Sequence, residues 1–493
     1  MPVDRIRGYY MKICFICDIH LPESKNALQH KAFQWALEDI CKNSPDCLIC
    51  AGDLTCAGSL ETYRFAVKSM NETGLPLLYI PGNSDLRSKE TKDIIALDAS
   101  PVLSNTCGIN IIAVNDSDGA ISDETYALLD SADKNTIVFM HHYIDALEKT
   151  HKEKMLSWRD NHKDTPLFTA HKHFFTVYEN DIRLPALDPD KNIGEEPAIV
   201  YYDTDTRKIT RSHFPCPMPK DLCEFIGISA YTPGDIRFAI EQGLKYLELR
   251  NNITKWDENE LIGLIAKWRN AGGVQLSIHL PDIGFDGKVL PHKDLKELLR
   301  LAKVLKAQRF TQHVPKISVK TARENKDALE SIAVYIARFM EDFPKEQIIG
   351  IENMHMTEKD SPDDSRRFGY LPEEVTEFMR LVKKHTKCKV GINFDNGHAR
   401  NNATYSREYQ LSSWYEALGL DIVGYHLHQV ISFGGEMENH TPFTEIYGRL
   451  ISLASFFRLW QDNEISHTPV ILEMRTKDAY PITLKTFGIL KEH

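Results

Sequence analysis

Two patterns of apolar and polar residues follow each other along the chain, and the change falls near residue 215. Before it, short apolar runs of strand length alternate with stretches of helical periodicity. These runs are KICFICDIH, DCLICAGDL, PLLYIPGNSD, INIIAVND, TIVFMHHYI and PLFTAHKH, then a predicted hairpin from PAIVYYD to KITRSHF. The alternation predicts a layered α/β domain over residues 1–214.

A proline-rich segment, FPCPMPKD, ends this first pattern and predicts a linker over residues 215–221. Beyond it, eight apolar runs recur with amphipathic helical stretches between them. The runs are FIGISAY, KYLELR, VQLSIHL, AQRFTQH, QIIGIEN, KVGINFD, IVGYHLH and PVILEMR. Eight strand-plus-helix units predict a (β/α)₈ TIM barrel over residues 222–493.

Composition limits the classes of function. The 493 residues are 42% hydrophobic, and 59 basic against 70 acidic residues give a net charge of −11. This balance argues against a broad basic surface for nucleic acid but leaves room for a local patch. The chain has no apolar run of membrane-spanning length and no apolar core of a secretory signal near its start, so we expect a cytoplasmic protein with no membrane partner. Its oligomeric state is not predicted.

Two Cys-x-x-Cys pairs, Cys14/Cys17 and Cys47/Cys50, raise the question of a zinc site. Each pair lies in an apolar run that predicts a buried strand, where residues three apart point to opposite faces. The two thiols of one pair then cannot reach the same ion. We therefore interpret these cysteines as small buried hydrophobic residues.

Polar residues with metal-binding side chains follow the predicted strands of the first domain, each where a strand runs into a loop. In an α/β sheet this edge is where ligands bind, so these residues should converge. They are Asp18, His20, Asp53, Asn83, Ser84, Asp85, His141, His171 and His173.

This set has the ligand types that two divalent cations about 4 Å apart require. We predict one ion at Asp18, His20 and His173. A second ion would lie at Asn83, His141 and His171, with Asp53 bridging the two. The cations would activate a water molecule and stabilise charge on phosphoryl oxygens.

The motifs D-I-H, G-D, G-N-S-D, H and A-H-K-H resemble those of the calcineurin-like metallophosphoesterases over about 210 residues. The resemblance implies an αββα sandwich with two ions of manganese, iron, nickel or zinc. It also assigns Asp53, Asn83 and Asp85 to catalysis, with Ser84 in contact with the substrate. Two positions depart from the family pattern: Ser84 replaces a histidine, and Ala170 replaces a glycine. His142 is the alternative to His141 as a ligand.

A second set of potential ligands follows the predicted barrel strands, on the C-terminal rim where barrel enzymes place catalytic groups. The set is His279, His313, Glu352, Asp395, His398, His426, His428, Glu438, His440 and Glu473. So many ligand types on one rim are difficult to explain by packing alone.

The segments SIHLP, TQHVP, GIENMH, FDNGHA, YHLH, ENHTPF and LEMR look like the endonuclease IV and xylose-isomerase-like superfamily. In its sugar isomerases one metal is held by residues that match Glu352, Asp395, His426 and Glu473. The endonuclease IV branch adds two zinc sites, which match His279 with His313, and His398 with Glu438 and His440. The resemblance thus implies one to three ions, zinc or manganese, with Glu352 in catalysis. Arg250 and His428 are candidate substrate-binding residues.

Three functional hypotheses follow. The preferred one is a metal-dependent phosphoesterase with two centres, which hydrolyses phosphodiester or phosphomonoester bonds in nucleic acid, nucleotides or sugar phosphates. The alternative is a bifunctional sugar-phosphate phosphatase and sugar isomerase or epimerase. A third possibility is a barrel that binds a partner or substrate without chemistry.

Overall fold

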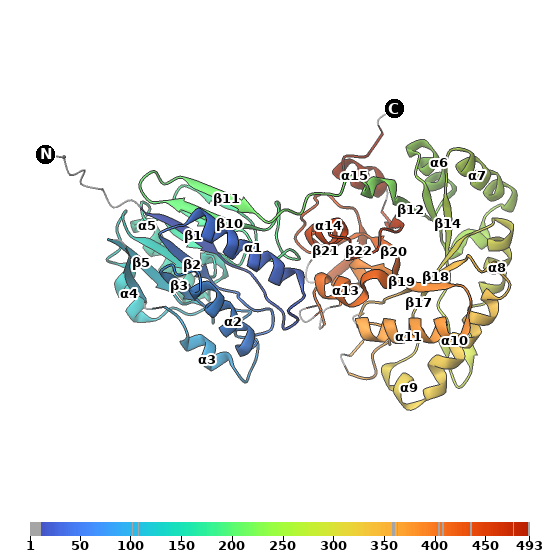
Figure 1. The fold of residues 1–493 in the computed structure, drawn as a ribbon, viewed down its shortest axis with the longest axis horizontal. Helices are drawn as coiled ribbons and strands as arrows, with labels where there is room; N and C mark the ends of the chain where they lie inside the picture. Colours follow the sequence, from blue (N-terminus) through green and yellow to red (C-terminus); the bar gives the residue numbers. More distant parts are fainter. Residues whose placement is uncertain are drawn as a thin grey trace. The chain divides into compact units, whose positions relative to one another are not determined.

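The computed structural model of the chain contains two folded units (Figure 1). One comprises Met1–Pro217 with Ser452–Ser455, and the other comprises Met218–Ile451 with Phe456–His493. The division therefore falls inside the proline-rich segment. The structure describes residues 11–100, 102–106, 108–356, 360–361, 363–402, 405–406, 409–433, 436–476 and 478–491.

The first unit is built on two β-sheets, with strand orders β11-β10-β1-β2-β3 and β4-β5-β6-β7-β9-β8. The first sheet contains β1 (Lys12–Ile16), β2 (Cys47–Ala51), β3 (Leu77–Ile80), β10 (Ala198–Asp203) and β11 (Ile209–His213). The second sheet contains β4 (Leu103–Thr106), β5 (Ile109–Val114), β6 (Ile137–Met140), β7 (Leu167–Thr169), β8 (Thr176–Tyr178) and β9 (Asp181–Arg183). Strands β1, β2 and β3 are parallel, as are β5, β6 and β7.

The two sheets face each other across a continuous apolar core. Phe15 of β1 stacks on Phe168 of β7 with ring centroids 4.0 Å apart. Tyr201 on the other face of the first sheet donates to Asp39 of α1 at 2.8 Å, and Trp158 of α5 packs on the outer face of the second sheet. This order of layers confirms the predicted αββα sandwich. Its helices are α1 (Leu28–Asn43), α2 (Leu60–Asn71), α3 (Lys92–Leu97), α4 (Asp123–Leu129) and α5 (Lys149–Asn161).

The paired cysteines are divided between the two faces of the first sheet. Cys17 and Cys47 belong to the core between the sheets. Cys14 and Cys50 lie three residues from them, on the opposite face, because side chains alternate along a strand. Cys14, Cys17 and Cys50 are free thiols.

The second unit is a closed parallel barrel with the strand order β12-β13-β14-β17-β18-β19-β20-β23. Its strands coincide with the eight predicted runs, so the predicted TIM barrel is confirmed. They are β12 (Ile226–Ala230), β13 (Tyr246–Leu249), β14 (Gln275–His279), β17 (Arg309–His313), β18 (Ile348–Glu352), β19 (Lys389–Asp395), β20 (Ile422–Leu427) and β23 (Val470–Leu472).

Helices cover the outside of the barrel, so its strands are buried on both faces and read as continuous apolar runs (Figure 1). The larger helices are α6 (Pro233–Gln242), α7 (Glu258–Asn270), α8 (Leu295–Val304), α10 (Lys326–Met340), α11 (Pro372–His385), α13 (Leu411–Leu418), α14 (Ala454–Gln461) and α15 (Ala479–Thr486). Shorter elements lie in the loops: α9 (Val319–Glu324), α12 (Asn396–Arg400), and the hairpins β15 (Gly284–Phe285) with β16 (Val289–Leu290) and β21 (Gln429–Phe433) with β22 (Glu436–Thr441).

Local sequence signals set the ends of these helices. At the start of α6, Thr232 and Asp235 form a reciprocal capping box, and Pro233 occupies the first turn, where a missing N–H costs nothing. Gly243 ends the helix in a left-handed conformation. Among the described residues, we find no helix with the length and apolar character to cross a bilayer.

Gly227 of β12 lies so close to β13 that we expect alanine to be excluded there. An added Cβ would lie 2.3 Å from the Tyr246 carbonyl oxygen. Gly227→Ala should therefore lower the free energy of unfolding by about 1–3 kcal/mol. Urea denaturation followed by circular dichroism measures this change.

Gly263 in α7 is the matched control, because no atom lies within 4 Å of the position that an added Cβ would take. Gly263→Ala should stabilise the chain by about 0.4–1 kcal/mol, since alanine restricts the unfolded chain and suits a helix. Equal effects of the two substitutions would contradict the packing argument.

Candidate metal centres

The predicted ligands of the first unit lie just beyond the C-terminal ends of strands from both sheets. Asp18 and Asp53 follow β1 and β2, and Asn83 follows β3. His141 and His171 follow β6 and β7 of the facing sheet. The predicted set is thus brought together from two sheets.

One group of ligand atoms gathers around Asp18. Its Oδ1 lies 3.5 Å from His173 Nε2, and that nitrogen lies 3.4 Å from His20 Nε2. His20 Nε2 is in turn 3.6 Å from Asp53 Oδ2. Asp18 Oδ1 is buried and has no hydrogen-bond partner. These four side chains could hold one cation.

A second group gathers on the other oxygen of Asp53. Asp53 Oδ1 lies 3.5 Å from His141 Nε2. The same nitrogen lies 3.1 Å from Asn83 Oδ1 and 3.3 Å from His171 Nδ1. Asp53 therefore presents one carboxylate oxygen to each group, which is the arrangement that a bridging ligand needs.

His141 is the better placed of the two adjacent histidines. Its Nδ1–H donates to the Ala51 carbonyl at 2.9 Å, which leaves Nε2 free within the cluster. His142 donates through Nδ1 to the Asp116 carbonyl at 2.9 Å, and its ring lies 4.6 Å from that of His171. His142 also forms a group with His141 and His171 whose ligand atoms could hold a metal ion, so it stays the alternative ligand.

Backbone conformation is unusual at these positions. Asp18, His20, Asp53, His171 and His173 all have positive φ angles between 48° and 66°. Residues other than glycine rarely adopt this region, and such strain is concentrated at functional sites.

A glycine is also required beside Asp53. A Cβ on Gly82 would lie 2.3 Å from Asp53 Oδ1. The G-D and G-N motifs therefore approach each other more closely than other residues would allow.

Ser84 and Asp85 are buried and contact the protein itself. Ser84 Oγ donates to the Thr55 carbonyl at 2.7 Å and lies 3.4 Å from His20 Nδ1. Asp85 accepts backbone N–H groups from Leu54, Thr55 and Gly82 at 2.7–3.1 Å. Burial and the nearby Asp53 raise the pKa of Asp85 to about 6. Ser84 thus lies beside His20, and Asp85 joins the loops that follow β2 and β3; their predicted parts in substrate contact and catalysis stay predictions.

In the barrel, Glu352 is the point at which the predicted ligands meet. His279 Nε2 and His426 Nδ1 each lie 3.3 Å from its Oε2. His313 Nε2 lies 3.5 Å from its Oε1, which has no hydrogen-bond partner. His426 Nδ1 also lies 2.7 Å from Glu473 Oε2.

Four of the six rim histidines, His279, His313, His398 and His440, share a hydrogen-bond pattern. In each, Nδ1–H donates to a fixed acceptor and Nε2 remains available, as expected for metal-binding imidazoles. The acceptors are the carbonyls of Leu280 for His279, Asn353 for His398 and Glu473 for His440, each at 3.0 Å, and Asp282 Oδ1 for His313 at 2.6 Å.

Several of the remaining ligand atoms are buried without a partner, which is costly unless a cation is bound. They include His279 Nε2, Glu352 Oε1, Asp395 Oδ2, Glu473 Oε2 and His426 Nδ1. Burial opposes ionisation, yet His426 and His313 keep the pKa of Glu352 well below its usual value. The donor set therefore fits one or more divalent cations.

His428 lies beside this set with both ring nitrogens engaged. Its Nδ1 accepts the backbone N–H of His440 at 2.9 Å, so the proton is on Nε2, which lies 3.1 Å from Asp395 Oδ1. The ring fits only because residue 397 is glycine, where a Cβ would lie 1.8 Å from His428 Cε1. His428 also forms, with His398 and His440, a group whose ligand atoms could hold a metal ion, and its predicted contact with substrate stays a prediction.

The other two predicted residues, Glu438 and Arg250, are placed differently from the ligand cluster. Glu438 lies on β22 and is exposed, whereas His398 and His440 are buried. Arg250 forms an ion pair with Glu473 Oε1 at 2.9 Å and lies over the Tyr231 ring. One oxygen of Glu473 thus contacts Arg250, and the other faces the ligand cluster.

Sequence reasoning missed Glu248 and Asp282. Glu248 is buried in β13 and lies 3.0 Å from His426 Nε2. Its signal was a single acidic residue inside an apolar barrel strand, in KYLELR. Asp282 had no such signal, because its contact with His313 arises only when two strands are adjacent.

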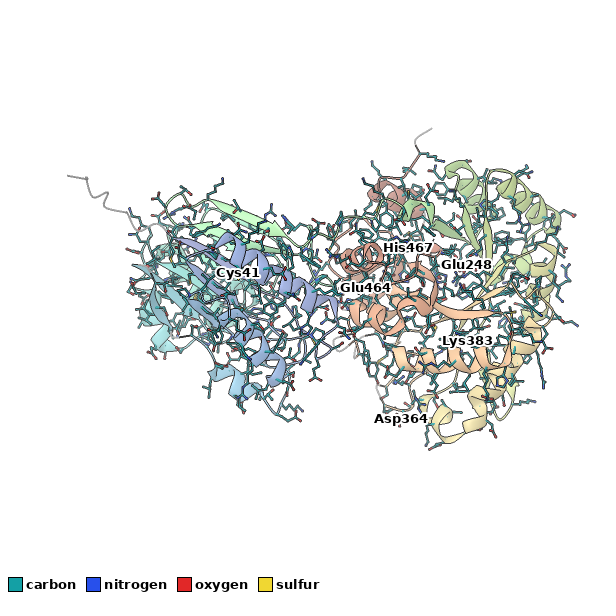
Figure 2. All side chains as sticks on the ribbon, in the orientation of Figure 1. Cys41, Glu248, Asp364, Lys383, Glu464 and His467 are labelled. Carbon is teal, nitrogen blue, oxygen red and sulfur yellow. The ribbon has the colours of Figure 1, made fainter. Side chains whose placement is uncertain are left out.

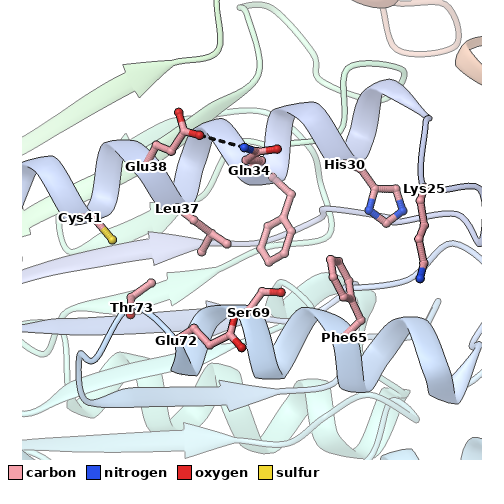
Figure 3. A pocket seen from close by; sticks show the side chains of 11 residues that line it. Lys25, His30, Gln34, Leu37, Glu38, Cys41, Phe65, Ser69, Glu72 and Thr73 are labelled. Carbon is pink, nitrogen blue, oxygen red and sulfur yellow. Dashed lines mark hydrogen bonds between the residues drawn. The ribbon is translucent and has the colours of Figure 1, made fainter.

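A separate groove lies between α1 and α2, with a volume of about 530 Å³ (Figure 3). Phe33, Leu37 and Cys41 line it from α1, and Phe65 and Glu72 from α2. Its lining includes none of the predicted ligands. The groove is therefore distinct from the cluster of predicted ligands at the strand ends.

The fold and these clusters define a two-part protein: an αββα sandwich of phosphoesterase type joined to a barrel with a rim of metal-ligand residues. Residues 236–492 match the xylose isomerase-like TIM barrel family, and residues 11–190 match the calcineurin-like phosphoesterase family. The chain belongs to the xylose isomerase-like TIM barrel family, and its first unit is a calcineurin-like phosphoesterase domain.

Individual relatives match one part or the other. A protein of Pseudoalteromonas sp. (strain SM9913), named a probable cyclic nucleotide phosphodiesterase, is 30% identical over 155 residues, which cover 27% of this chain and 56% of that protein. Endonuclease IV from Thermus thermophilus is 16% identical, with a TM-score of 0.38 over 54% of this chain and 97% of its own. The 3-keto-D-glucoside 4-epimerase YcjR from E. coli is 12% identical, with a TM-score of 0.37 over 54% and 97%.

The different contacts of His398 and His428 lead to a test by metal content. His398→Ala should remove a ligand and lower the number of divalent ions bound per chain at saturation. His428→Ala should keep that number but weaken binding by about 10- to 100-fold, because Asp395 loses its support. Elemental analysis and a competition titration with a chromophoric chelator measure both. A lower saturating number in His428→Ala would show that this residue is itself a ligand.

Proposed function

We propose that the chain is a metal-dependent phosphate-ester hydrolase with a binuclear centre in its first unit and a second centre in the barrel. The observation that carries the proposal is the position of Asp53. Its two oxygens face two separate groups of ligands, at 3.6 Å from His20 and 3.5 Å from His141. A single-ion site would not need a carboxylate divided in this way.

Residues of the first unit have distinct roles in this proposal. Bound cations would supply an activated water and charge stabilisation for the phosphoryl oxygens. Ser84 orients His20, and Asp85 holds the loops after β2 and β3. Because the Ser84 hydroxyl donates to the Thr55 carbonyl, it does not protonate a leaving group. Substrates with a leaving group that departs without protonation are then favoured.

A phosphodiester is the substrate class that we favour for this unit. The replacement of the third-motif histidine by Ser84 removes the group suited to protonating a poor leaving group. The relative from Pseudoalteromonas is named a probable cyclic nucleotide phosphodiesterase, which agrees with this choice. A nucleotide or a nucleic-acid end would present such a bond.

For the barrel, the proposal of phosphate-ester hydrolysis rests on more potential metal ligands than a single ion needs. Glu352 lies between His279 and His313 on one side and His426 on the other. The Nε2 atoms of both His279 and His313 are directed at this carboxylate, with Nδ1 tied elsewhere. Two ions bridged by Glu352 would use all of these nitrogen atoms, which favours hydrolysis of a phosphate ester. Glu438, a predicted ligand of a third ion, is exposed, so the structure supports that ion less than the other two.

We expect the two centres to be separable by substitution. Asp53→Asn should lower hydrolysis of bis(p-nitrophenyl) phosphate by at least about 100-fold, because it removes the bridging charge. Glu352→Gln should leave that activity in place and abolish the hydrolysis that belongs to the barrel. Steady-state kinetics on phosphodiester and phosphomonoester substrates would show the division. If Asp53→Asn alone removes all activity on every substrate, the barrel is a binding domain.

The second candidate is a sugar isomerase or epimerase in the barrel, with the first unit as a phosphatase. The compact group of Glu352, Asp395, His426 and Glu473 supports it, because the three carboxylates lie around His426 Nδ1 at 2.7–3.8 Å. A single ion there would suffice.

Solvent deuterium distinguishes the two candidates. Isomerisation moves a proton next to a carbonyl, so it should place deuterium on carbon, whereas hydrolysis leaves carbon-bound hydrogen atoms unchanged. Sugar phosphates incubated with the enzyme in D₂O and analysed by mass spectrometry give the answer. We expect no deuterium above that of a Glu352→Gln control, and incorporation by the parent enzyme alone would favour the isomerase.

A further inference from the structure

Glu248 is a buried acidic residue of the barrel (Figure 2). It lies outside the segments in which the sequence predicts metal ligands. It is the third residue of β13 and is 0% exposed. A carboxylate in such a position is costly unless each oxygen has a partner. Its surroundings therefore indicate what it does.

One oxygen of Glu248 is satisfied by hydroxyl groups from the next two strands of the barrel. Its Oε2 accepts hydrogen bonds from Ser277 Oγ of β14 at 3.0 Å and from Thr311 Oγ1 of β17 at 2.7 Å. These two contacts fix the plane of the carboxylate. The other oxygen, Oε1, lies 3.0 Å from His426 Nε2 and accepts a hydrogen bond from Arg250 Nη1 at 3.5 Å.

The opposite side of the same imidazole ring faces the predicted ligands. His426 Nδ1 lies 2.7 Å from Glu473, 3.3 Å from Glu352 and 3.8 Å from Asp395. His426 therefore presents Nδ1 to the cluster, whereas the four histidines that donate through Nδ1 present Nε2. A proton kept on Nε2 by Glu248 leaves the Nδ1 lone pair directed at the cluster.

The position of His426 explains why a carboxylate is needed here. His279, His398 and His440 donate Nδ1–H to a carbonyl of a loop or strand end, and His313 donates to Asp282. His426 lies within β20, between β19 and β23, where the strand carbonyls take part in the barrel ladder. A side-chain acceptor from across the barrel has to replace them.

We propose that Glu248 is a positioning residue that fixes His426 as the Nε2–H tautomer and so presents Nδ1 to the barrel cation. The inference rests on the proposed metal centre of the barrel. Glu248 is close enough to His279, His426 and Glu473 to be considered a ligand itself. Its two oxygens, however, already face Ser277, Thr311 and His426, whereas Glu352, Asp395 and Glu473 each keep one oxygen without a partner.

The test uses the full-length chain with Asp53→Asn, so that cobalt(II) reports on the barrel. Three further variants are compared: Glu248→Met, which removes the acceptor at similar size; Glu248→Gln, which keeps an amide oxygen; and Ser277→Ala, which removes one hydroxyl donor only. Cobalt affinity is measured by competition with a chromophoric chelator. The visible absorption spectrum at saturation reports the ligand set.

We expect Glu248→Met to weaken cobalt binding by about 10- to 100-fold, as other losses of such support do. Glu248→Gln should weaken it less, and Ser277→Ala should stay near the parent. The spectrum of Glu248→Gln at saturation should match the parent, because His426 and not Glu248 is the ligand. If Glu248→Met does not fold, as judged by circular dichroism, Glu248→Gln and its spectrum decide.

Three results would overturn the inference. Unchanged affinity in Glu248→Met would show that Glu248 does not support His426. Loss of one cobalt equivalent at saturation in both Glu248 variants, with an altered spectrum, would make Glu248 a ligand. A parent that binds no cobalt in the barrel would remove the proposed centre as well, and it differs from the other two results because the parent itself fails.

Discussion

Buried carboxylates gather at the end of the barrel at distances that require positive charge between them. Glu248, Glu352, Asp395 and Glu473 are each at most 1% exposed, and like charges so close would destabilise the fold if left alone. Arg250 and the surrounding imidazoles offset part of this charge. Glu352, Asp395 and Glu473 each keep one carboxylate oxygen without a hydrogen-bond partner. A divalent cation bound among them would satisfy these oxygen atoms together.

The two units meet the same requirement by different means. In the phosphoesterase domain the backbone positions the ligands: Asp18, His20 and Asp53 have left-handed conformations, and Gly82 lets two loops approach. In the barrel, hydrogen-bond acceptors position most of the imidazole rings. Of the described rim ligands there, His440 alone has a positive φ, and acceptors such as Asp282 hold the rings instead. Strand ends converge naturally at a barrel rim, so less backbone strain is needed.

The contacts of each imidazole nitrogen distinguish the histidines within a centre. Each imidazole has two nitrogens, and a contact at one determines what the other can do. His279 and His428 differ in this respect although both are buried: His279 keeps Nε2 free, while His428 uses both nitrogens for His440 and Asp395. The same reasoning separates the two oxygens of Asp53, which face different groups, from those of Asp85, which face backbone N–H groups.

Much of this protein follows from its sequence. Apolar runs of strand length predicted both folds, and eight of these runs follow the proline-rich segment. Such runs are informative because a strand buried on one or both faces has a characteristic pattern of apolar residues. Ligand types at the ends of those runs predicted Asp18, Asp53, Glu352 and most of their neighbours, because strand ends meet at one edge. Tertiary structure alone decided which atoms of Ser84, His428 and Glu248 contact other groups. Which atom of a side chain is already engaged depends on groups that are distant in sequence, as Glu248 is from His426, and no local pattern records such a contact.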